Sequence, residues 1–178
     1  KVTVLGYCMG ATIASIHAAL HPDLYAGFIN LLGPIDFSEA GMLGRMTDSR
    51  WFDAEVIAAA GNVDPQQMQW GFKLLRPTQD VAKAVTLLDK AGDAAFGVSY
   101  RALEAWAGDN VAFPAAAYAT YITELYQKNW LIQGKHCALG QRVNLKAITC
   151  PLLTVSAEKD TICPPMAAVA LNAAAGSR

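Results

Sequence analysis

A cysteine flanked by two glycines, in the segment Gly6-Tyr7-Cys8-Met9-Gly10, is the part of this sequence best suited to nucleophilic chemistry. A thiolate held at an exposed turn can attack a carbonyl carbon, and a helix N-terminus is expected to raise the thiolate fraction of Cys8. The spacing is that of a nucleophile elbow, with G-x-C-x-G in place of G-x-S-x-G. The glycines should let strand and helix approach closely, and the Met9 backbone N–H should face the oxyanion.

The segments around this motif predict the elements that would position it. Residues 1–7 are rich in β-formers and predict a buried parallel strand, and residues 9–20 predict the helix that follows it. Two further short apolar segments, residues 24–32 and 151–156, predict strands of the same sheet. Strands separated by helical segments indicate an α/β fold with a parallel sheet.

A long helical stretch separates the second predicted strand from the third. Its patterns predict helices at residues 53–60, 64–75, 81–91 and 96–107, and no strand. We therefore expect a helical cap inserted at residues 36–114, between a first core part at residues 1–35 and a returning core part at residues 115–178. Residues 115–128 predict one amphipathic helix, whose tyrosine stripe is interpreted as core or cap packing.

Asp160 is the second candidate for the site. It lies just past the carboxyl end of the strand predicted at residues 151–156, which is the sheet edge where α/β folds assemble their sites. In this architecture the triad order along the chain is nucleophile, acid, histidine, and Asp160 follows Cys8 as that order requires. A solvated turn residue is the alternative interpretation of Asp160.

None of the three histidines, His17, His21 and His136, follows Asp160. Each is interpreted as an ordinary core or surface histidine. We expect the general base of the triad to lie beyond residue 178, and the sequence to be a fragment cut at both ends.

The composition excludes several classes of function. The formal net charge is −1, from 14 basic and 15 acidic residues, so no electrostatic footprint for nucleic acid is present. No apolar stretch is long enough to predict a transmembrane helix. The four cysteines form no C-x-x-C pair, so we expect no metal site and no disulfide framework, in a reducing cytoplasmic compartment.

Several motifs together resemble those of the polyhydroxyalkanoate synthase family. The residues that carry the resemblance cover nearly the whole chain: Gly6–Thr12, Asn30–Phe37, Phe72–Pro77, Trp106, Phe113–Tyr118, Glu124–Asn129, Thr149–Leu153 and Ala157–Asp160 with Pro164–Pro165. Two positions depart from the family pattern. Ala11 stands where the family usually has a second glycine, and Thr161 stands where many relatives have a histidine.

The resemblance implies a partial α/β-hydrolase-type sheet with a helical cap. It makes Cys8 the nucleophile and Asp160 the acid of an acyltransferase that polymerises 3-hydroxyacyl-CoA into a polyester and releases CoA. It implies no cofactor, since CoA is part of the substrate, and partners that include the growing polyester, a second synthase subunit and further copies of the chain. The location would be cytoplasmic, at the polymer granule surface. Without the family's histidine the chain alone would be inactive.

Two other interpretations stay open. A hydrolase similar to dienelactone hydrolase also uses a G-x-C-x-G elbow, although that family lacks a large helical insertion between nucleophile and acid. A module that binds polymer or a partner subunit, without catalysis, is the other alternative. The presence of both Cys8 and Asp160 argues against such a module.

Overall fold

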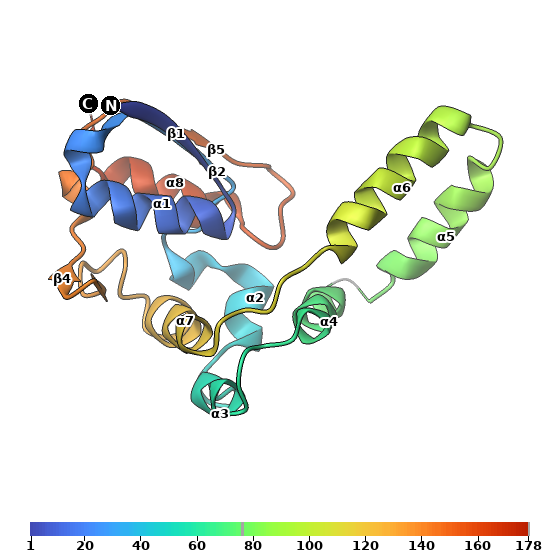
Figure 1. The fold of residues 1–178 in the computed structure, drawn as a ribbon, viewed down its shortest axis with the longest axis horizontal. Coiled ribbons are helices and arrows are strands. Elements are labelled where there is room, and N and C mark those ends of the chain that lie inside the picture. The colour runs from blue at the N-terminus through green and yellow to red at the C-terminus, as the bar shows by residue number, and fades with distance from the viewer. Residues whose placement is uncertain (76, 178) are drawn as a thin grey trace. The chain divides into compact units, whose positions relative to one another are not determined.

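The computed structural model describes residues 1–75 and 77–177, and its contacts divide the chain into two compact units. One unit consists of residues 1–54 and 119–178, and the other of residues 55–118. The first contains a small sheet with its helices, and the second consists mainly of helices (Figure 1). Cys8 and Asp160 both belong to the first unit.

The first unit is built on a parallel sheet, which within the described residues has three strands in the order β1-β2-β5. The strands are β1 (Val2–Tyr7), β2 (Tyr25–Leu31) and β5 (Leu152–Val155). Helix α1 (Met9–Leu20) and the short 3₁₀ helix η1 (Pro22–Leu24) connect β1 to β2. This arrangement confirms the predicted α/β fold class with a parallel sheet.

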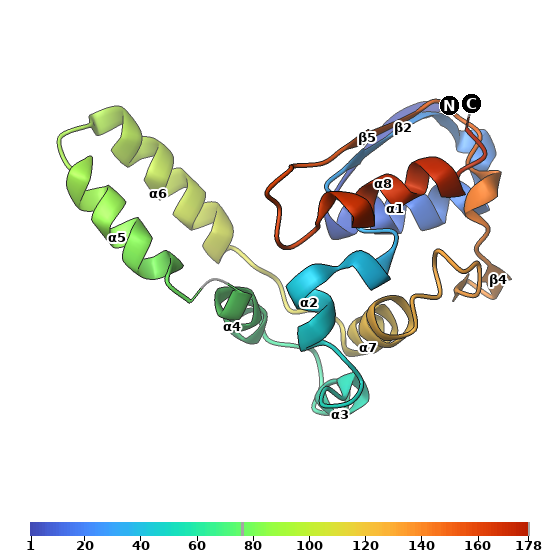
Figure 2. The same ribbon diagram turned by 180° about the vertical axis from the view of Figure 1, so that it is seen from behind.

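The helices α1 and α8 (Pro165–Ala174) lie on the same side of the sheet (Figure 1 and Figure 2). On that side Phe28 is almost fully buried, with 1% of its surface exposed. On the opposite side Leu5, Tyr7 and Leu153 are 57%, 51% and 54% exposed. The prediction of a buried first strand is therefore wrong for this second face of β1.

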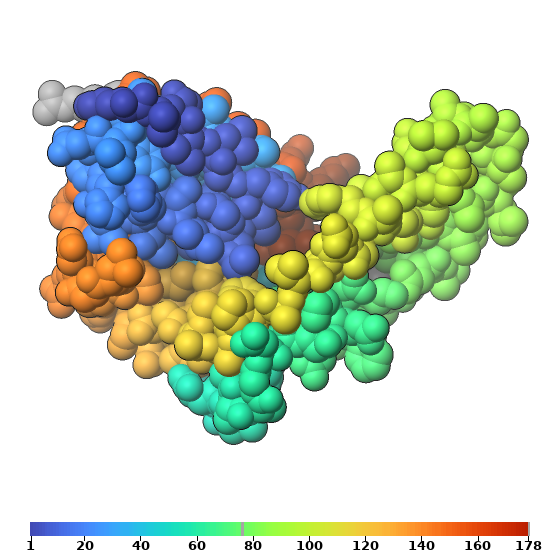
Figure 3. Space-filling view, viewed as in Figure 1, coloured from blue at the N-terminus to red at the C-terminus, as the bar shows by residue number. Residues whose placement is uncertain are grey.

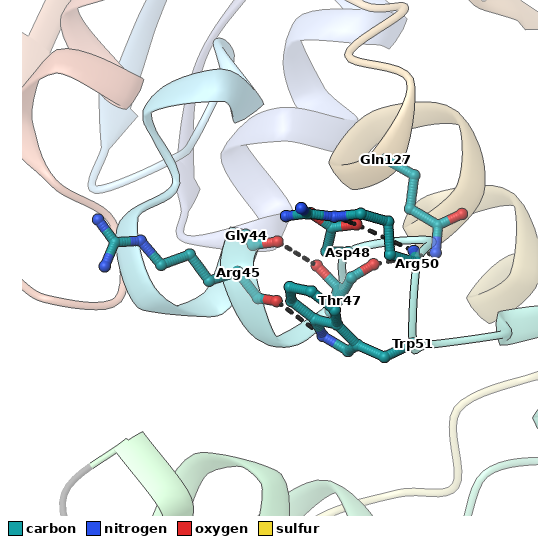
Figure 4. A network of polar contacts seen from close by, with 7 residues as sticks. All are labelled: Gly44, Arg45, Thr47, Asp48, Arg50, Trp51 and Gln127. Atoms are coloured by element: carbon teal, nitrogen blue, oxygen red, sulfur yellow. Dashed lines mark hydrogen bonds and ion pairs between the residues drawn. The ribbon is translucent and has the colours of Figure 1, made fainter.

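The chain leaves β2 through the 3₁₀ helix η2 (Phe37–Glu39) and the short helix α2 (Gly41–Met46), which a polar network follows (Figure 4). The Thr47 hydroxyl donates to a carbonyl one turn earlier, at 2.9 Å, and Trp51 Nε1 donates to the Arg45 carbonyl at 3.1 Å. Gln127 Nε2 donates to the carbonyls of Thr47 and Phe52 at 2.9 and 3.0 Å. Gln127 therefore ties residues 47–52 to the later segment that carries it.

The segment that contains Gln127 differs from its prediction. In place of one helix at residues 115–128, α7 (Ala115–Thr120) continues into the π-helix η3 (Tyr121–Gln127). The wider turn is seen where the Lys128 N–H donates to the Thr123 carbonyl, five residues earlier, at 3.1 Å. The chain then forms an antiparallel hairpin of β3 (Cys137–Ala138) and β4 (Gln141–Arg142), and the 3₁₀ helix η4 (Leu145–Ala147) leads to β5.

The second unit contains the helices that the sequence predicted in the middle of the chain. They are α3 (Ala54–Ala59), α4 (Pro65–Leu75), α5 (Gln79–Asp89) and α6 (Ala94–Gly108), and none of the described residues of α4, α5 and α6 is buried. Helices α5 and α6 lie side by side (Figure 3), joined by an ion pair of 2.6 Å between Lys83 and Glu104. Arg76 of the predicted cap motif lies outside the described residues, and the cap limits at 36 and 114 remain a prediction.

Candidate active site

Cys8 occupies the turn between β1 and α1, with φ +52° and ψ −126°. A positive φ costs a residue with a Cβ about 1–3 kcal/mol, so the surrounding contacts must hold this conformation. The Cys8 N–H donates to the Leu31 carbonyl of β2 at 2.9 Å, and the Cys8 carbonyl accepts from the Ala11 N–H at 2.9 Å. The next strand and the first turn of α1 thus fix the strained turn, as is typical of a nucleophile elbow.

Close packing of α1 against the sheet depends on two glycines, Gly6 and Gly33. A Cβ on Gly6 would collide with the Ala11 backbone, and a Cβ on Gly33 would collide with the Ala11 side chain. Ala11 itself is 0% exposed, so it cannot move aside. The expectation that Gly10 also serves the close approach is wrong, because a Cβ at Gly10 would meet nothing.

The environment of the Cys8 thiol shifts its acidity in the direction opposite to our expectation. Burial raises the pKa of Cys8 above 9.0, a hydrogen bond from the Met9 backbone N–H lowers it, and the negative charge of Asp160 raises it. Burial outweighs the helix N-terminus because removing a thiolate from water costs more than one N–H returns. The thiol is therefore protonated at neutral pH and needs a proton acceptor in order to attack.

Asp160 follows β5 and lies close enough to Cys8 for the two side chains to interact electrostatically. Its Oδ1 atom accepts the backbone N–H groups of Ile162 and Cys163, at 2.8 and 3.0 Å, and its own N–H donates to the Ala157 carbonyl at 3.0 Å. Its Oδ2 atom has no hydrogen-bond partner among the residues that the structure describes. The carboxylate is thus oriented through one oxygen, and the other can receive an imidazole N–H.

Three further side chains that the sequence did not assign to the site lie near Cys8. Tyr121, Tyr126 and Cys163 each interact electrostatically with the Cys8 thiol. Burial, with added repulsion from Asp160 and Cys8, raises the pKa of Cys163 to about 12. The sequence shows the tyrosines as an aromatic stripe, a pattern that indicates packing, and nothing in it marks Cys163 beyond its place three residues after Asp160.

The three histidines have other partners. His17 Nδ1 is 2.9 Å from the Tyr25 hydroxyl, and His21 ends α1 by donating its backbone N–H to the His17 carbonyl. His136 is 5% exposed, and its Nδ1 lies 2.7 Å from Glu124 Oε2, so it joins the hairpin segment to η3. The structure therefore places Cys8 with Asp160 and gives each histidine a role in packing.

Within residues 1–75 and 77–177, no three side chains of histidine, cysteine, aspartate or glutamate come together as a metal site would require. Among the same residues, no helix combines the length and apolar character that a bilayer crossing needs.

The strand–turn–helix at Cys8, the parallel sheet and the acid after β5 define an α/β hydrolase architecture. A sequence model of the alpha/beta hydrolase fold family matches residues 1–177, and the chain belongs to that family.

Curated relatives point to one branch of that family. The chain is 30% identical to the poly(3-hydroxyalkanoate) polymerase subunit PhaC of Allochromatium vinosum, over 97% of the chain and 49% of the relative. It is 29% identical to PhaC of Synechocystis, over 97% of the chain and 47% of the relative, and 28% identical to PhaC of Haloferax mediterranei, over 97% and 36%. The resemblance inferred from the motifs is confirmed, and the chain spans about half the length of these relatives or less.

Proposed function

We propose that this chain is the catalytic part of a polyhydroxyalkanoate synthase, an acyltransferase that joins 3-hydroxyacyl groups from CoA thioesters into a polyester. The observation that carries the proposal is the pairing of the strained Cys8 elbow with Asp160, in a chain similar to poly(3-hydroxyalkanoate) polymerase subunits. Cys8 precedes Asp160 in the chain, as the order nucleophile, acid, histidine requires.

In the proposed reaction Cys8 Sγ attacks the thioester carbonyl carbon of the substrate. The oxyanion that forms is stabilised by the Met9 backbone N–H at the N-terminus of α1. The C–S bond to CoA breaks, CoA leaves as a thiol after taking up a proton, and the acyl group stays on Cys8. The 3-hydroxyl of another acyl unit then attacks this acyl group, so that an ester bond forms and the Cys8 thiol is restored.

The chemistry of a thioester suits a cysteine nucleophile. Exchanging one thioester for another is close to balanced in energy, so the acyl group on Cys8 keeps its reactivity toward the next hydroxyl. No cofactor is needed, because CoA belongs to the substrate. Exclusion of water would favour transfer to a hydroxyl over hydrolysis.

Because the pKa of Cys8 is raised, a general base must remove the thiol proton before Cys8 can attack. We propose a histidine in this role, outside residues 1–178, bound through its N–H to Asp160 Oδ2. The three histidines of the chain are engaged elsewhere, in hydrogen bonds to Tyr25 and Glu124 and at the end of α1. The 178-residue chain by itself is accordingly expected to show no turnover.

The test is CoA release from 3-hydroxybutyryl-CoA by the full-length gene product and by its Cys8→Ala variant. CoA release with insoluble polyester, both lost in Cys8→Ala, is the expected result. Release of free 3-hydroxybutyrate without polymer would show a hydrolase instead. No reaction in either protein would leave a binding module as the better interpretation.

A further inference from the structure

Two tyrosines of the π-helix η3, Tyr121 and Tyr126, face the candidate nucleophile together. In an α-helix two residues five positions apart point about 140° away from each other. In a π-helix, whose hydrogen bonds join residues five apart, such residues lie nearly one above the other. The two rings are accordingly in contact, with centroids 5.8 Å apart, and both phenols interact electrostatically with Cys8. The π-helix therefore presents a pair of phenols where an α-helix would present one.

Neighbouring groups fix the ring of Tyr126. The Phe37 ring packs edge-on against Tyr126, with centroids 4.7 Å apart, and also against Tyr121 at 5.9 Å. Asn129, just after η3, holds Phe37 by accepting its backbone N–H at 2.9 Å. Gln127, next to Tyr126, donates to the carbonyl of Thr47, which is drawn with it in Figure 4, and to that of Phe52. These contacts of Phe37 and Gln127 therefore fix the position of Tyr126 before a substrate binds.

The two phenols differ in what their hydroxyl groups bind. Tyr121 has a side-chain hydrogen bond with Thr12, whose hydroxyl also donates to the Pro34 carbonyl at 2.7 Å. The Tyr126 hydroxyl has no hydrogen-bond partner among residues 1–75 and 77–177. Among these residues every fully buried side-chain nitrogen or oxygen atom has a hydrogen-bond partner. The Tyr126 hydroxyl, which has none, is therefore accessible to solvent.

The Tyr126 phenol has two thiols near it and stays protonated. Tyr126 interacts electrostatically with the Cys8 thiol, which would hold the acyl group, and with the Cys163 thiol. Burial raises the pKa of Tyr126 well above 10, so the phenol stays protonated and can donate a hydrogen bond throughout the physiological range. A phenol can also accept a hydrogen bond, which makes it a suitable partner for an alcohol.

A 3-hydroxyacyl group brings two oxygens into the site. In the proposed reaction the carbonyl oxygen accepts a hydrogen bond from the Met9 N–H at the elbow. No group of the elbow binds the oxygen on carbon 3. We propose that the Tyr126 hydroxyl binds the 3-oxygen of the acyl group held on Cys8, and so selects 3-hydroxyacyl over unsubstituted acyl thioesters. This inference rests on the proposed function and adds a substrate-contacting residue to it.

Tyr126→Phe in the full-length gene product tests the contact, because it keeps the ring and removes only the hydroxyl. Single-turnover CoA release is measured with 3-hydroxybutyryl-CoA and with butyryl-CoA, which lacks the 3-hydroxyl. Loss of one buried hydrogen bond is worth about a tenfold change in rate. We expect Tyr126→Phe to slow acylation by 3-hydroxybutyryl-CoA about tenfold and to leave the butyryl-CoA rate unchanged. Tyr100→Phe, in the second unit, is the matched control and should change neither rate.

An equal loss with both substrates would overturn the proposal, since it would place the phenol on the carbonyl oxygen. No loss with either substrate would overturn it as well. A second measurement needs no variant: the unmodified protein should acylate about tenfold faster with 3-hydroxybutyryl-CoA than with butyryl-CoA, and equal rates would refute the contact. If the unmodified protein releases no CoA from either thioester, the proposed function itself fails, which is a separate result.

Discussion

Asn30 is the side chain on which the turn beside the nucleophile most depends. It is 0% exposed, and its Oδ1 atom accepts the Gly33 N–H at 3.0 Å. Its Nδ2 atom donates to the carbonyl of Gly33 at 3.2 Å and to that of Ala168, in α8, at 3.3 Å. One amide thus closes the turn after β2 and joins it to the helix that follows the acid loop.

Asn30→Ala removes all three hydrogen bonds without adding a group that could replace them. At about 1 kcal/mol for each bond, the free energy of unfolding should fall by about 3 kcal/mol. The buried Gly33 N–H is left without its acceptor, which places the loss at the upper end of the usual range. Because Gly33 packs against Ala11 and the Cys8 carbonyl, the rate of CoA release should fall too.

The assay is urea denaturation of the full-length gene product, with midpoint and slope compared between variants. Asn110→Ala is the control, because Asn110 is exposed and makes one local hydrogen bond, to the Ala107 carbonyl at 2.8 Å. It should cost less than about 0.5 kcal/mol. A loss below about 1 kcal/mol in Asn30→Ala would refute the view that this amide holds the turn.

Three further predictions concern the same unit. The folded protein holds the pKa of Cys163 at about 12, against 9.0 for an ordinary thiol, so the unfolded chain ionises first and stability falls as pH rises from about 9 to 12. At pH 10.5 this loss is about 2 kcal/mol, and urea unfolding of Cys163→Val should show an alkaline loss smaller by that amount; equal slopes would contradict the assignment. Gly33→Ala should destabilise by about 1–3 kcal/mol through overpacking against Ala11, with partial rescue by Ala11→Gly in thermal denaturation, and no rescue would show that another contact decides the cost. His136→Ala should lower stability by about 3 kcal/mol because Glu124 loses its partner, while CoA release by the folded variant continues; abolished release would make His136 part of the chemistry.

The position of Cys8 at a sharp turn between a strand and a helix could be predicted because its signals are local. The glycine beside the strand, the apolar strand and the helix that follows all lie within a few residues of Cys8, and steric rules allow few conformations for such a segment. Asp160 follows from a rule of topology, since the carboxyl ends of parallel strands meet at one edge of the sheet. The structure brings the two side chains within electrostatic reach, as that rule requires.

The π-helix could not be predicted, because its sequence also fits an α-helix. Ile122 and Leu125, three residues apart and 7% and 2% exposed, satisfy α-helical periodicity. The stripe that also holds Tyr121 and Tyr126 is likewise interpreted as one side of an α-helix, so it gives no sign of a wider turn. In the structure the hydrogen bond from the Lys128 N–H to the Thr123 carbonyl, five residues earlier, shows the wider turn, and both phenols interact electrostatically with Cys8.

The acidity of Cys8 was predicted with the wrong sign for a related reason. The sequence shows the helix N-terminus that lowers a thiol pKa, but burial of the thiol depends on which distant segments pack around it, which the local sequence does not show. Desolvation is a property of the assembled site, and here it is the largest influence on Cys8.

This acidity also decides what Asp160 can do. With no cation between them, the carboxylate opposes ionisation of Cys8, because two negative charges would lie close together. An imidazole placed between Asp160 Oδ2 and the thiol reverses the effect: the imidazolium that forms on proton transfer is stabilised by Asp160 and in turn stabilises the thiolate. With a histidine between them, Asp160 would therefore favour formation of the Cys8 thiolate, whereas without one it disfavours it. We accordingly expect Asp160→Asn to slow CoA release in the full-length protein, even though it removes a charge that raises the pKa of Cys8.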